Sequence, residues 1–346
     1  MLPYSYIKDF VLNNFRNYRE LKVSFSEGIN IIFAPNGFGK TNILEAISFF
    51  SPGRGFRNAN LLDILNKDES HIFHNPLWSI FGKIENNNIA DKISIFTTYD
   101  DKIKKNLRIN EDLAKNQNIL NSIFSIIWMT PQTELFFIDG AVNRRKFLDR
   151  AVYIIDPEHA TRVTKYEFLV RERMKVLTDN KKFDEKWLDV LERKIAEVGV
   201  AIATASDEMV YNLNKVFDEY DFNFPSLLVK INGYFEDMLS SKTAVEVEND
   251  FISKLKENRQ NDLRSKKTNF GLHRSDLEII YKEKNINAEF CSTGEQKSFL
   301  ISLTIAKSIV CKYLKNSNPI LLLDELPSHL DIKKREIVFN EIERYE

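Results

Sequence analysis

The sequence predicts an α/β fold in which both ends of the chain contribute to a mixed sheet, with an antiparallel flank and an inserted helical lobe. Three observations carry this prediction. A glycine-bearing turn lies between a short apolar run and a helical pattern, at 28–50. Short alternating strands follow at 77–110, and long charged helical patterns at 143–220. A second short apolar run lies close to the other end, at 319–324.

The composition is that of an ordinary globular protein. Of the 346 residues, 43% are hydrophobic and 29% are charged, which is enough apolar side chain for a sizeable core. The formal net charge of -1 excludes a chain that is basic overall, so a polyanion site must be a local patch. Two cysteines make no disulfide framework, and no apolar stretch reaches the roughly 18 residues of a membrane span. We therefore expect a cytoplasmic protein with no membrane partner.

Hydrophobic periodicity indicates the order of the elements. The pattern at 42–50 has helical spacing, and so do those at 143–155, 157–177, 183–220 and 293–314. The run Gly28–Phe33 has the pattern of a buried strand. The other expected strands are 6–16, 21–25, 77–84, 92–99, 105–110, 226–231, 277–281 and 319–324. Lys102, Lys104 and Lys105 indicate an edge strand whose charged side chains prevent pairing with a strand of another molecule.

The turn after Gly28–Phe33 has the features of a phosphate-binding loop. It consists of Ala34, Pro35, Asn36, Gly37, Phe38, Gly39, Lys40 and Thr41, with Asn42 following in the helix. Gly37 and Gly39 permit the backbone to turn its N–H groups toward nucleotide phosphates. Lys40 would reach the outer phosphates, and the Thr41 hydroxyl would bind Mg²⁺. The alternative is a chance glycine turn, and Ala34 replaces the first glycine of the pattern.

A second motif supports the first. Four aliphatic residues, Ile320 to Leu323, end in Asp324 and Glu325. A buried parallel strand would deliver Asp324 to the edge of the sheet where ligands bind. Asp324 could hold Mg²⁺ there, and Glu325 could polarise the attacking water. The alternative is a core strand that ends in a solvated acidic turn.

The run Ser292-Thr293-Gly294-Glu295-Gln296-Lys297 opens a helix and resembles the signature motif of ABC-type ATPases. In that superfamily the motif closes over the γ-phosphate of ATP bound to a second subunit, so Ser292, Gly294 and Glu295 are candidate nucleotide contacts. Its helix N-terminus and serine hydroxyl suit an anion. The alternative is a helix cap made by a serine or threonine and the following acid, and both interpretations can hold together.

Two further positions match the superfamily. Gln132 stands at the position where ABC-type ATPases have a glutamine that contacts the metal and the attacking water. Asp331 ends a segment that resembles the D-loop of these ATPases. Lys40 and Ser292 lie 252 positions apart, since 292 − 40 = 252. Transport ATPases have a much shorter spacing, and SMC proteins have a much longer one filled by coiled coils.

The dispersed blocks of sequence resemble the RecF family of bacterial DNA-repair proteins. The matching blocks are 12–18, 36–47, Arg54-Gly55-Phe56-Arg57, 144–150 and 271–277. Ala34, Phe38 and Leu272 depart from the family pattern, and the chain ends at Glu346, before the family's last strand. The resemblance implies an ABC-type P-loop ATPase head with three parts. These are residues 1–140, a helical lobe at 141–255, and a shortened C-terminal half at 256–346.

The resemblance also implies a function. The expected protein binds ATP and Mg²⁺, hydrolyses ATP weakly, and forms an ATP-dependent homodimer on gapped or junction DNA. It would help RecO and RecR load RecA onto single strands. An ABC-type ATPase that acts on a protein or transport partner is the alternative.

Two basic clusters are candidates for the DNA contact. They contain Arg54 and Arg57 in one stretch, and Arg144, Arg145, Lys146 and Arg150 in another. Arg57, Arg144 and Arg145 are the best candidates, because contacts with DNA phosphates require cations and do not depend on the base sequence. The alternative for each arginine is a solvated surface position or an ion pair with a nearby acid.

Overall fold

The computed structural model describes the chain in segments: 5–67, 76–86, 89–100, 102–131, 136–179, 185–220, 223–325 and 332–345. The chain forms two compact units, which we call unit 1 (Met1–Thr133 and Lys307–Glu346) and unit 2 (Glu134–Ala306). The expected α/β class, with antiparallel strands and inserted helices, is confirmed. No helix in the described part of the chain combines the length and the apolar character that a membrane span requires.

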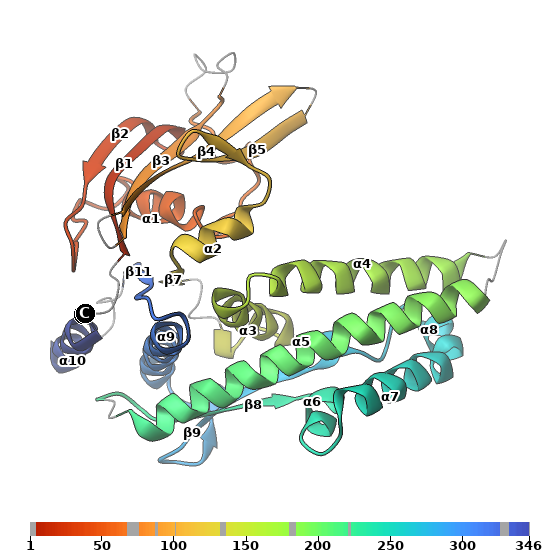
Figure 1. The fold of residues 1–346 in the computed structure, drawn as a ribbon. Coiled ribbons are helices and arrows are strands. Elements are labelled where there is room, and N and C mark those ends of the chain that lie inside the picture. Colours follow the sequence, from red (N-terminus) through yellow and green to blue (C-terminus); the bar gives the residue numbers. More distant parts are fainter. Residues whose placement is uncertain are drawn as a thin grey trace. The chain divides into compact units, whose positions relative to one another are not determined.

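Unit 1 is built around an antiparallel sheet of six strands in the order β2-β1-β3-β4-β5-β6 (Figure 1). Its strands are β1 Ser5–Phe15, β2 Tyr18–Ser24, β3 Ser79–Asn86, β4 Ile89–Asp100, β5 Lys102–Ile109 and β6 Asp112–Ala114. The other elements are α1 Lys40–Ser48, α2 Leu120–Ile123, β7 Ile126–Met129, β11 Ile320–Leu323 and α10 Ile332–Tyr345. Helix α9, Thr293–Lys315, crosses from unit 2 into unit 1.

Side chains alternate along these strands, so one face of the sheet is apolar and buried. Ile80 on β3 and Ile95 on β4 are fully buried, and Ile47 of α1 packs in the same core cluster. Three aromatic rings, of Phe15, Phe49 and Trp78, meet edge to face in pairs with centroids 5.7 to 6.0 Å apart. Helix α1 therefore rests on the inner face of the sheet, as Figure 1 shows.

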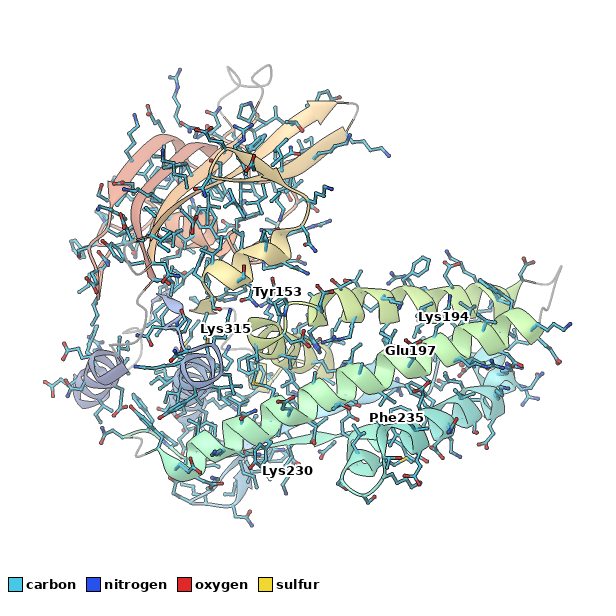
Figure 2. The ribbon with its side chains drawn as sticks, viewed as in Figure 1. Tyr153, Lys194, Glu197, Lys230, Phe235 and Lys315 are labelled. Atoms are coloured by element: carbon cyan, nitrogen blue, oxygen red, sulfur yellow. The ribbon has the colours of Figure 1, made fainter. Side chains whose placement is uncertain are left out.

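A short parallel pair joins distant parts of the chain. Strand β11 pairs with β7 in parallel, with Ile320 opposite Ile126 and Leu323 opposite Met129. Lys315, at the end of α9 (Figure 2), donates hydrogen bonds to the Asn121 side-chain oxygen at 3.0 Å and to the Ser125 hydroxyl at 2.7 Å. The pair thus brings together two segments that are far apart in the sequence, and among the described residues it forms a two-stranded sheet of its own.

The prediction of a buried strand at Gly28–Phe33 is wrong. The segment has no assigned strand, and Ile31 and Phe33 are 78% and 93% exposed. A strand requires a neighbour for its backbone hydrogen bonds, and no described strand pairs with this segment, since β11 pairs with β7. The apolar pattern alone could not reveal the missing neighbour.

Unit 2 contains long helices and a three-stranded sheet. Its helices are α3 Ala141–Ile155, α4 His159–Thr178, α5 Glu185–Glu219, α6 Tyr234–Leu239, α7 Ala244–Glu257 and α8 Arg259–Ser265. Its strands β8 Leu227–Asn232, β9 Asp276–Tyr281 and β10 Ile286–Asn287 have the order β10-β9-β8. Helices α4 and α5 pack side by side around a core that includes Tyr166, Ile195 and Phe251.

A buried charge network ties the helices of unit 2 together. Arg173 is fully buried and donates to Glu192 at 2.9 Å, to Asp262 at 2.6 Å and to the Leu255 carbonyl at 2.7 Å. Arg259 also binds Glu192, at 2.6 Å. These residues are charged helix positions that periodicity would assign to the surface, so the sequence offered no signal for the network.

The two units differ from the three-part division expected from the motifs. Residues 256–306 belong to unit 2 with the helices. The physical reason is that β9 pairs with β8 along six residues, from Leu227 opposite Tyr281 to Asn232 opposite Asp276. The three-part functional division stays a prediction.

Candidate nucleotide-binding site

The predicted phosphate-binding loop turns through two left-handed glycines. Gly37 has φ 86° and Gly39, the residue before α1, has φ 94°. A Cβ on Gly39 would lie 2.5 Å from the Asn17 side-chain nitrogen, so any other residue there would have to displace the Asn17 side chain. Ala34 is absent from the described residues with positive φ. Alanine therefore carries no strain where the pattern has its first glycine.

The turn between β1 and β2 holds this loop in place. The Phe38 carbonyl accepts hydrogen bonds from the Asn17 amide at 3.2 Å and from the Tyr18 hydroxyl at 3.0 Å. Asn42, in the first turn of α1, donates to the Asn17 side-chain oxygen at 2.8 Å. Asn17 and Tyr18 are not among the predicted site residues, although both belong to a block that resembles the RecF family.

Lys40 lies over the loop. Its Nζ donates to the Ala34 carbonyl at 2.6 Å and to the Pro35 carbonyl at 3.1 Å. The ammonium group is thus held above the turn whose N–H groups would surround a phosphate. A bound phosphate would offer it charged acceptors in place of neutral carbonyls, which is the stronger interaction.

Thr41 and Asp324 meet although 283 positions separate them. The Thr41 hydroxyl donates to Oδ1 of Asp324 at 3.3 Å. Burial raises the pKa of the Asp324 carboxyl, and the charge of Glu325 raises it further. A hydroxyl beside a partly buried carboxylate is an oxygen donor set that suits Mg²⁺. The two residues therefore fit the metal that the sequence predicts, and a cation there would relieve the unfavourable burial of charge.

Glu325 directly follows Asp324 in an unusual conformation. It is exposed and has φ 53°, in the left-handed region that costs a non-glycine residue about 1–2 kcal/mol. Such strain is often found at functional positions. The side chain thus lies at the edge of the site, next to the expected metal ligand.

The signature run forms a helix cap, as the alternative interpretation expected. The Ser292 hydroxyl and backbone N–H both donate to the Glu295 carboxylate, at 2.7 and 3.0 Å, and the Glu295 N–H faces the Ser292 oxygen at 3.4 Å. Lys284 binds the other Glu295 oxygen at 2.5 Å. These bonds hold the Glu295 pKa down to about 2, from an ordinary value of 4.5. A Cβ on Gly294 would meet nothing within 4 Å, so this turn has an open side.

Gln132 and Asp331 lie outside the described residues, so their predicted contacts with the metal, water and nucleotide stay predictions. Within the described segments, no group of three histidine, cysteine, aspartate or glutamate residues could hold a metal ion. The expected Mg²⁺ ligands are the Thr41 hydroxyl, the Gln132 amide and the Asp324 carboxylate, and only the last belongs to the residue types in such a group.

Arg57 takes part in a network behind the loop. Its guanidinium donates to Asn42 at 2.8 Å and to Glu45 at 3.0 Å. Glu45 is fully buried on α1 and also accepts two bonds from Arg16, at 2.9 and 2.6 Å. One buried carboxylate thus joins the β1–β2 turn, α1 and the segment that carries Arg57. Arg57 has a structural role, and a DNA contact by it stays a prediction.

Arg144 and Arg145 are also bonded within the chain. Arg144 forms a two-point pair with Asp276, at 2.7 and 2.8 Å, and its third bond goes to the Asp139 carbonyl at 2.6 Å. This pair lowers the Asp276 pKa. Arg145 donates to the Ser275 carbonyl at 2.6 Å, and burial lowers its pKa. Both arginines join α3 to the start of β9, which favours the ion-pair alternative over free DNA contacts.

Comparison with known sequences identifies close relatives. Residues 6–133 match the family model described as the RecF/RecN/SMC N terminal domain. The DNA replication and repair protein RecF of Rickettsia canadensis is 37% identical over 339 residues, an alignment that covers 96% of this chain and 89% of the relative. The protein of the same name from Rhizobium rhizogenes is 35% identical over 344 residues, covering 98% of this chain and 89% of the relative.

Comparison with solved structures shows the same fold. The recombination mediator protein RecF with ATP, of the RecFOR pathway, matches with a TM-score of 0.85 and 23% identity over 98% of this chain and 90% of that one. RecF with ATPrS matches with a TM-score of 0.84 and 22% identity, over 97% of this chain and 90% of that one. Since sequence identity to both is low, these matches establish the fold and no more.

Proposed function

Because the chain belongs to the RecF family, we propose that it is a cytosolic, ATP-dependent DNA-binding clamp of recombinational repair and replication. Two copies joined by ATP would bind DNA at gaps or junctions between single and double strands. The clamp would act with RecO and RecR to load RecA. The names of the relatives support DNA over a protein or transport partner, since each is a DNA replication and repair protein.

The observation that carries this proposal is the bond between Thr41 and Asp324 at 3.3 Å. It unites the end of the phosphate-binding loop with the end of β11, and no local pattern could bring these two residues together. Lys40 and the loop N–H groups would bind the ATP phosphates, and Thr41 and Asp324 would hold Mg²⁺. Bound there, Mg²⁺ would neutralise charge on the phosphate oxygens.

Glu325 would be the base for hydrolysis. Water would attack the γ-phosphorus, the bond to the β–γ bridging oxygen would break, and the water proton would pass to a Glu325 carboxylate oxygen. Gln132 would orient the same water and contact the metal. The exposed position of Glu325 beside Asp324 supports this role.

The signature turn would bind ATP held by the second subunit. Ser292, Gly294 and Glu295 would contact the γ-phosphate of that ATP, and Asp331 would lie nearby. The open side of Gly294 supports this role, because a ligand can approach the helix N-terminus there.

The decisive experiment measures DNA binding with and without ATP, on duplex, single-stranded and gapped substrates. We expect ATP to strengthen binding to gapped DNA and Lys40→Met to abolish that effect, because it removes the loop's side-chain cation. Ser292→Arg should keep ATP binding and lose the ATP-induced dimer in light scattering. An affinity for gapped DNA that ATP does not change in the unaltered protein would contradict the clamp.

Glu325→Gln tests the catalytic assignment. The amide keeps the shape of the side chain but cannot accept the proton. We expect single-turnover hydrolysis to stop while ATP still binds, so that the ATP-bound dimer accumulates. Asp324→Asn should instead weaken metal and ATP binding. Turnover of Glu325→Gln at the unaltered rate would show that another group handles the water.

Arg57, Arg144 and Arg145 stay candidates for DNA contact. Each lost duplex phosphate contact should reduce the slope of log affinity against log salt by about 0.9. Arg144→Ala with Arg145→Ala tests this directly. An unchanged slope, together with lower thermal stability, would leave these two residues with their structural role alone.

A further inference from the structure

Unit 2 contains a cavity of about 290 Å³, and no residue of the predicted phosphate-binding loop lines it. Its wall is formed by α3, α4, α5, α6, β8 and the segment 272–277, all within unit 2. The apolar part of the wall includes Leu148, Val163, Val170, Ile202 and Leu272. A cavity with apolar walls and a few convergent polar groups is the usual form of a small-molecule site. The polar groups of the wall therefore indicate the chemistry of a ligand.

One carboxylate in this wall lacks a counter-ion. Glu236 lies on α6 directly after Phe235, which packs in the core of unit 2 (Figure 2), and it is only 7% exposed. Its Oε2 accepts a hydrogen bond from the Ser275 hydroxyl at 3.0 Å, and a Cβ on Gly233 would come within 2.1 Å of that oxygen. Among the residues that the structure describes, no lysine, arginine or histidine lies within ion-pair distance of Glu236.

Burial makes the charge of this carboxylate unfavourable. It raises the pKa of Glu236, and hydrogen bonds from the residue's own backbone N–H and from Ser275 offset only part of this effect. These donors are neutral, so they leave the buried negative charge without a counter-charge. A cation in the cavity would therefore stabilise the ionised form.

The two arginines that line the cavity face other acids. Asp149 and Asp276 lie near the Arg145 guanidinium and favour its charge. Arg171 pairs with Glu167 at 3.8 Å, and the side chains of both are more than half exposed. Each arginine thus has carboxylate neighbours of its own. The counter-ion of the α6 carboxylate would have to come from a ligand.

An aromatic side chain lies near that carboxylate. Tyr166 on α4 lines the cavity and is 5% exposed, and its hydroxyl accepts a hydrogen bond from the Leu272 N–H at 3.0 Å, which fixes the ring. Burial raises the pKa of Tyr166, and the charge of Glu236 raises it further, so the two groups are close. Burial lowers the pKa of His273, also in the wall, and its Nε2 faces the Thr268 carbonyl at 2.7 Å, which favours a neutral imidazole. A carboxylate beside an aromatic ring suits an organic ammonium ion.

We propose that this cavity binds a small organic ammonium ion, a primary amine on a short aliphatic chain. The ammonium group donates to the Glu236 carboxylate and lies against the Tyr166 ring, while the chain packs on Val163, Val170 and Ile202. A metal ion is disfavoured, because one carboxylate in an apolar wall offers too few oxygen ligands. A neutral molecule or an anion would leave the carboxylate without a counter-ion. The site acts independently of ATP, since its wall contains no residue of the phosphate-binding loop.

The test is a titration of the full chain with n-butylamine at neutral pH, without nucleotide, followed by saturation-transfer NMR. We expect saturable binding to the unaltered protein. Glu236→Gln keeps the volume and the acceptor for Ser275 but removes the charge, so it should weaken binding roughly tenfold, the loss of one charged hydrogen bond. Tyr166→Leu removes the ring and should weaken binding roughly fivefold, the loss of one cation–π contact.

Matched controls isolate the charge and the place of binding. Butanol and butyrate have the same chain length without the cation, and each should bind roughly tenfold more weakly than n-butylamine. Glu197 on α5 is exposed (Figure 2), so Glu197→Gln removes a carboxylate outside the cavity and should leave butylamine binding unchanged. Lys40→Met should also leave it unchanged while it removes ATP-dependent binding to gapped DNA. Failure of this proposal and failure of the clamp are therefore distinguishable.

Three results would overturn the inference. One is the lack of saturable butylamine binding to the unaltered protein. Another is an unchanged affinity in Glu236→Gln, when circular dichroism shows an unaltered fold. The third is equal binding of butanol and n-butylamine, which would assign binding to the apolar wall alone. The comparison with butanol uses only the unaltered protein, so it decides the question even where a substitution disturbs the fold.

Discussion

The phosphate-binding loop and the signature turn are both glycine-bearing turns at the start of a helix, but different contacts hold them. The loop before α1 depends on distant residues: Asn17 and Tyr18 bind the Phe38 carbonyl, and the space beside Gly39 is filled. The signature turn is held by near neighbours in sequence, Lys284 and Glu295, and the space beside Gly294 is empty.

The phosphate-binding loop is therefore preorganised, whereas the signature turn is open on one side. Backbone groups fixed in advance lose little entropy when a ligand binds, so the loop is suited to hold a nucleotide within one chain. The signature turn forms on its own by a local capping box, and its open side suits a ligand presented from outside the chain. Four substitutions test whether the contrast holds, from the largest expected effect to the smallest.

Gly39→Ala should have the largest effect. Alanine at φ 94° costs about 1–2 kcal/mol, and displacing Asn17 breaks two hydrogen bonds worth about 1 kcal/mol each. We expect the free energy of unfolding to fall by roughly 3 kcal/mol and ATP affinity to fall more than tenfold. Urea unfolding and nucleotide titration measure the two effects. Unaltered ATP affinity would show that the loop is not preorganised.

Glu45→Gln should have the next largest effect. Glutamine keeps the volume but removes the buried charge that holds Arg16 and Arg57. Because both arginines are partly exposed, we expect a loss of about 2 kcal/mol in stability, less than for a fully buried pair. ATP affinity should also fall, since Arg57 supports Asn42. Glu20→Gln, which removes an exposed ion pair with Lys22, is the control and should change stability little.

The cap of the signature turn should weaken in acid. The folded-state pKa of Glu295 is lowered to about 2, so its contribution is fully present above its ordinary value of 4.5 and is lost as pH falls toward 2. Hydrogen exchange at the first turn of α9 should speed up across this window. Glu295→Gln should remove that dependence. Equal pH dependence in the two proteins would assign the acid effect to other carboxyl groups.

Gly294→Ala should have the smallest effect on the fold. The new methyl group meets nothing within 4 Å, and alanine is the better helix former by about 0.5–1 kcal/mol. We expect unaltered or slightly higher stability, normal ATP binding by the monomer, and a weaker ATP-induced dimer in light scattering. This substitution is the matched control for Gly39→Ala. A large loss of stability would mean that the signature turn is not open.

Much of the fold was predictable because local patterns carry it. Alternation gave the strands of the six-stranded sheet within a few residues, as at 6–16 against Ser5–Phe15, and helical spacing did the same for Glu185–Glu219. The left-handed glycines of the loop and the Ser292–Glu295 cap also follow from short-range chemistry, so both turns could be located from the sequence.

Pairings between distant residues were not predictable. Arg57 and Arg144, which are candidates for DNA contact, are bonded to Glu45 and Asp276, because a guanidinium binds whichever carboxylate the fold brings near. The apolar run Gly28–Phe33 reads as a strand, yet it is exposed because no described strand pairs with it. Lys105, expected at a blunted strand edge, is partly buried and bonded to Gln117, and burial lowers its pKa to about 8.

By itself the sequence determined where the two glycine-bearing turns lie and which residues are candidates to bind phosphate and metal, because glycine dihedrals, a lysine, a hydroxyl and capping groups act over a few positions. Only the tertiary structure decided that Thr41 meets Asp324 and that Asn17 supports Phe38. The reason is that these contacts depend on strand register and helix packing. Register and packing are set by the burial of the whole core, so no single sequence motif specifies them.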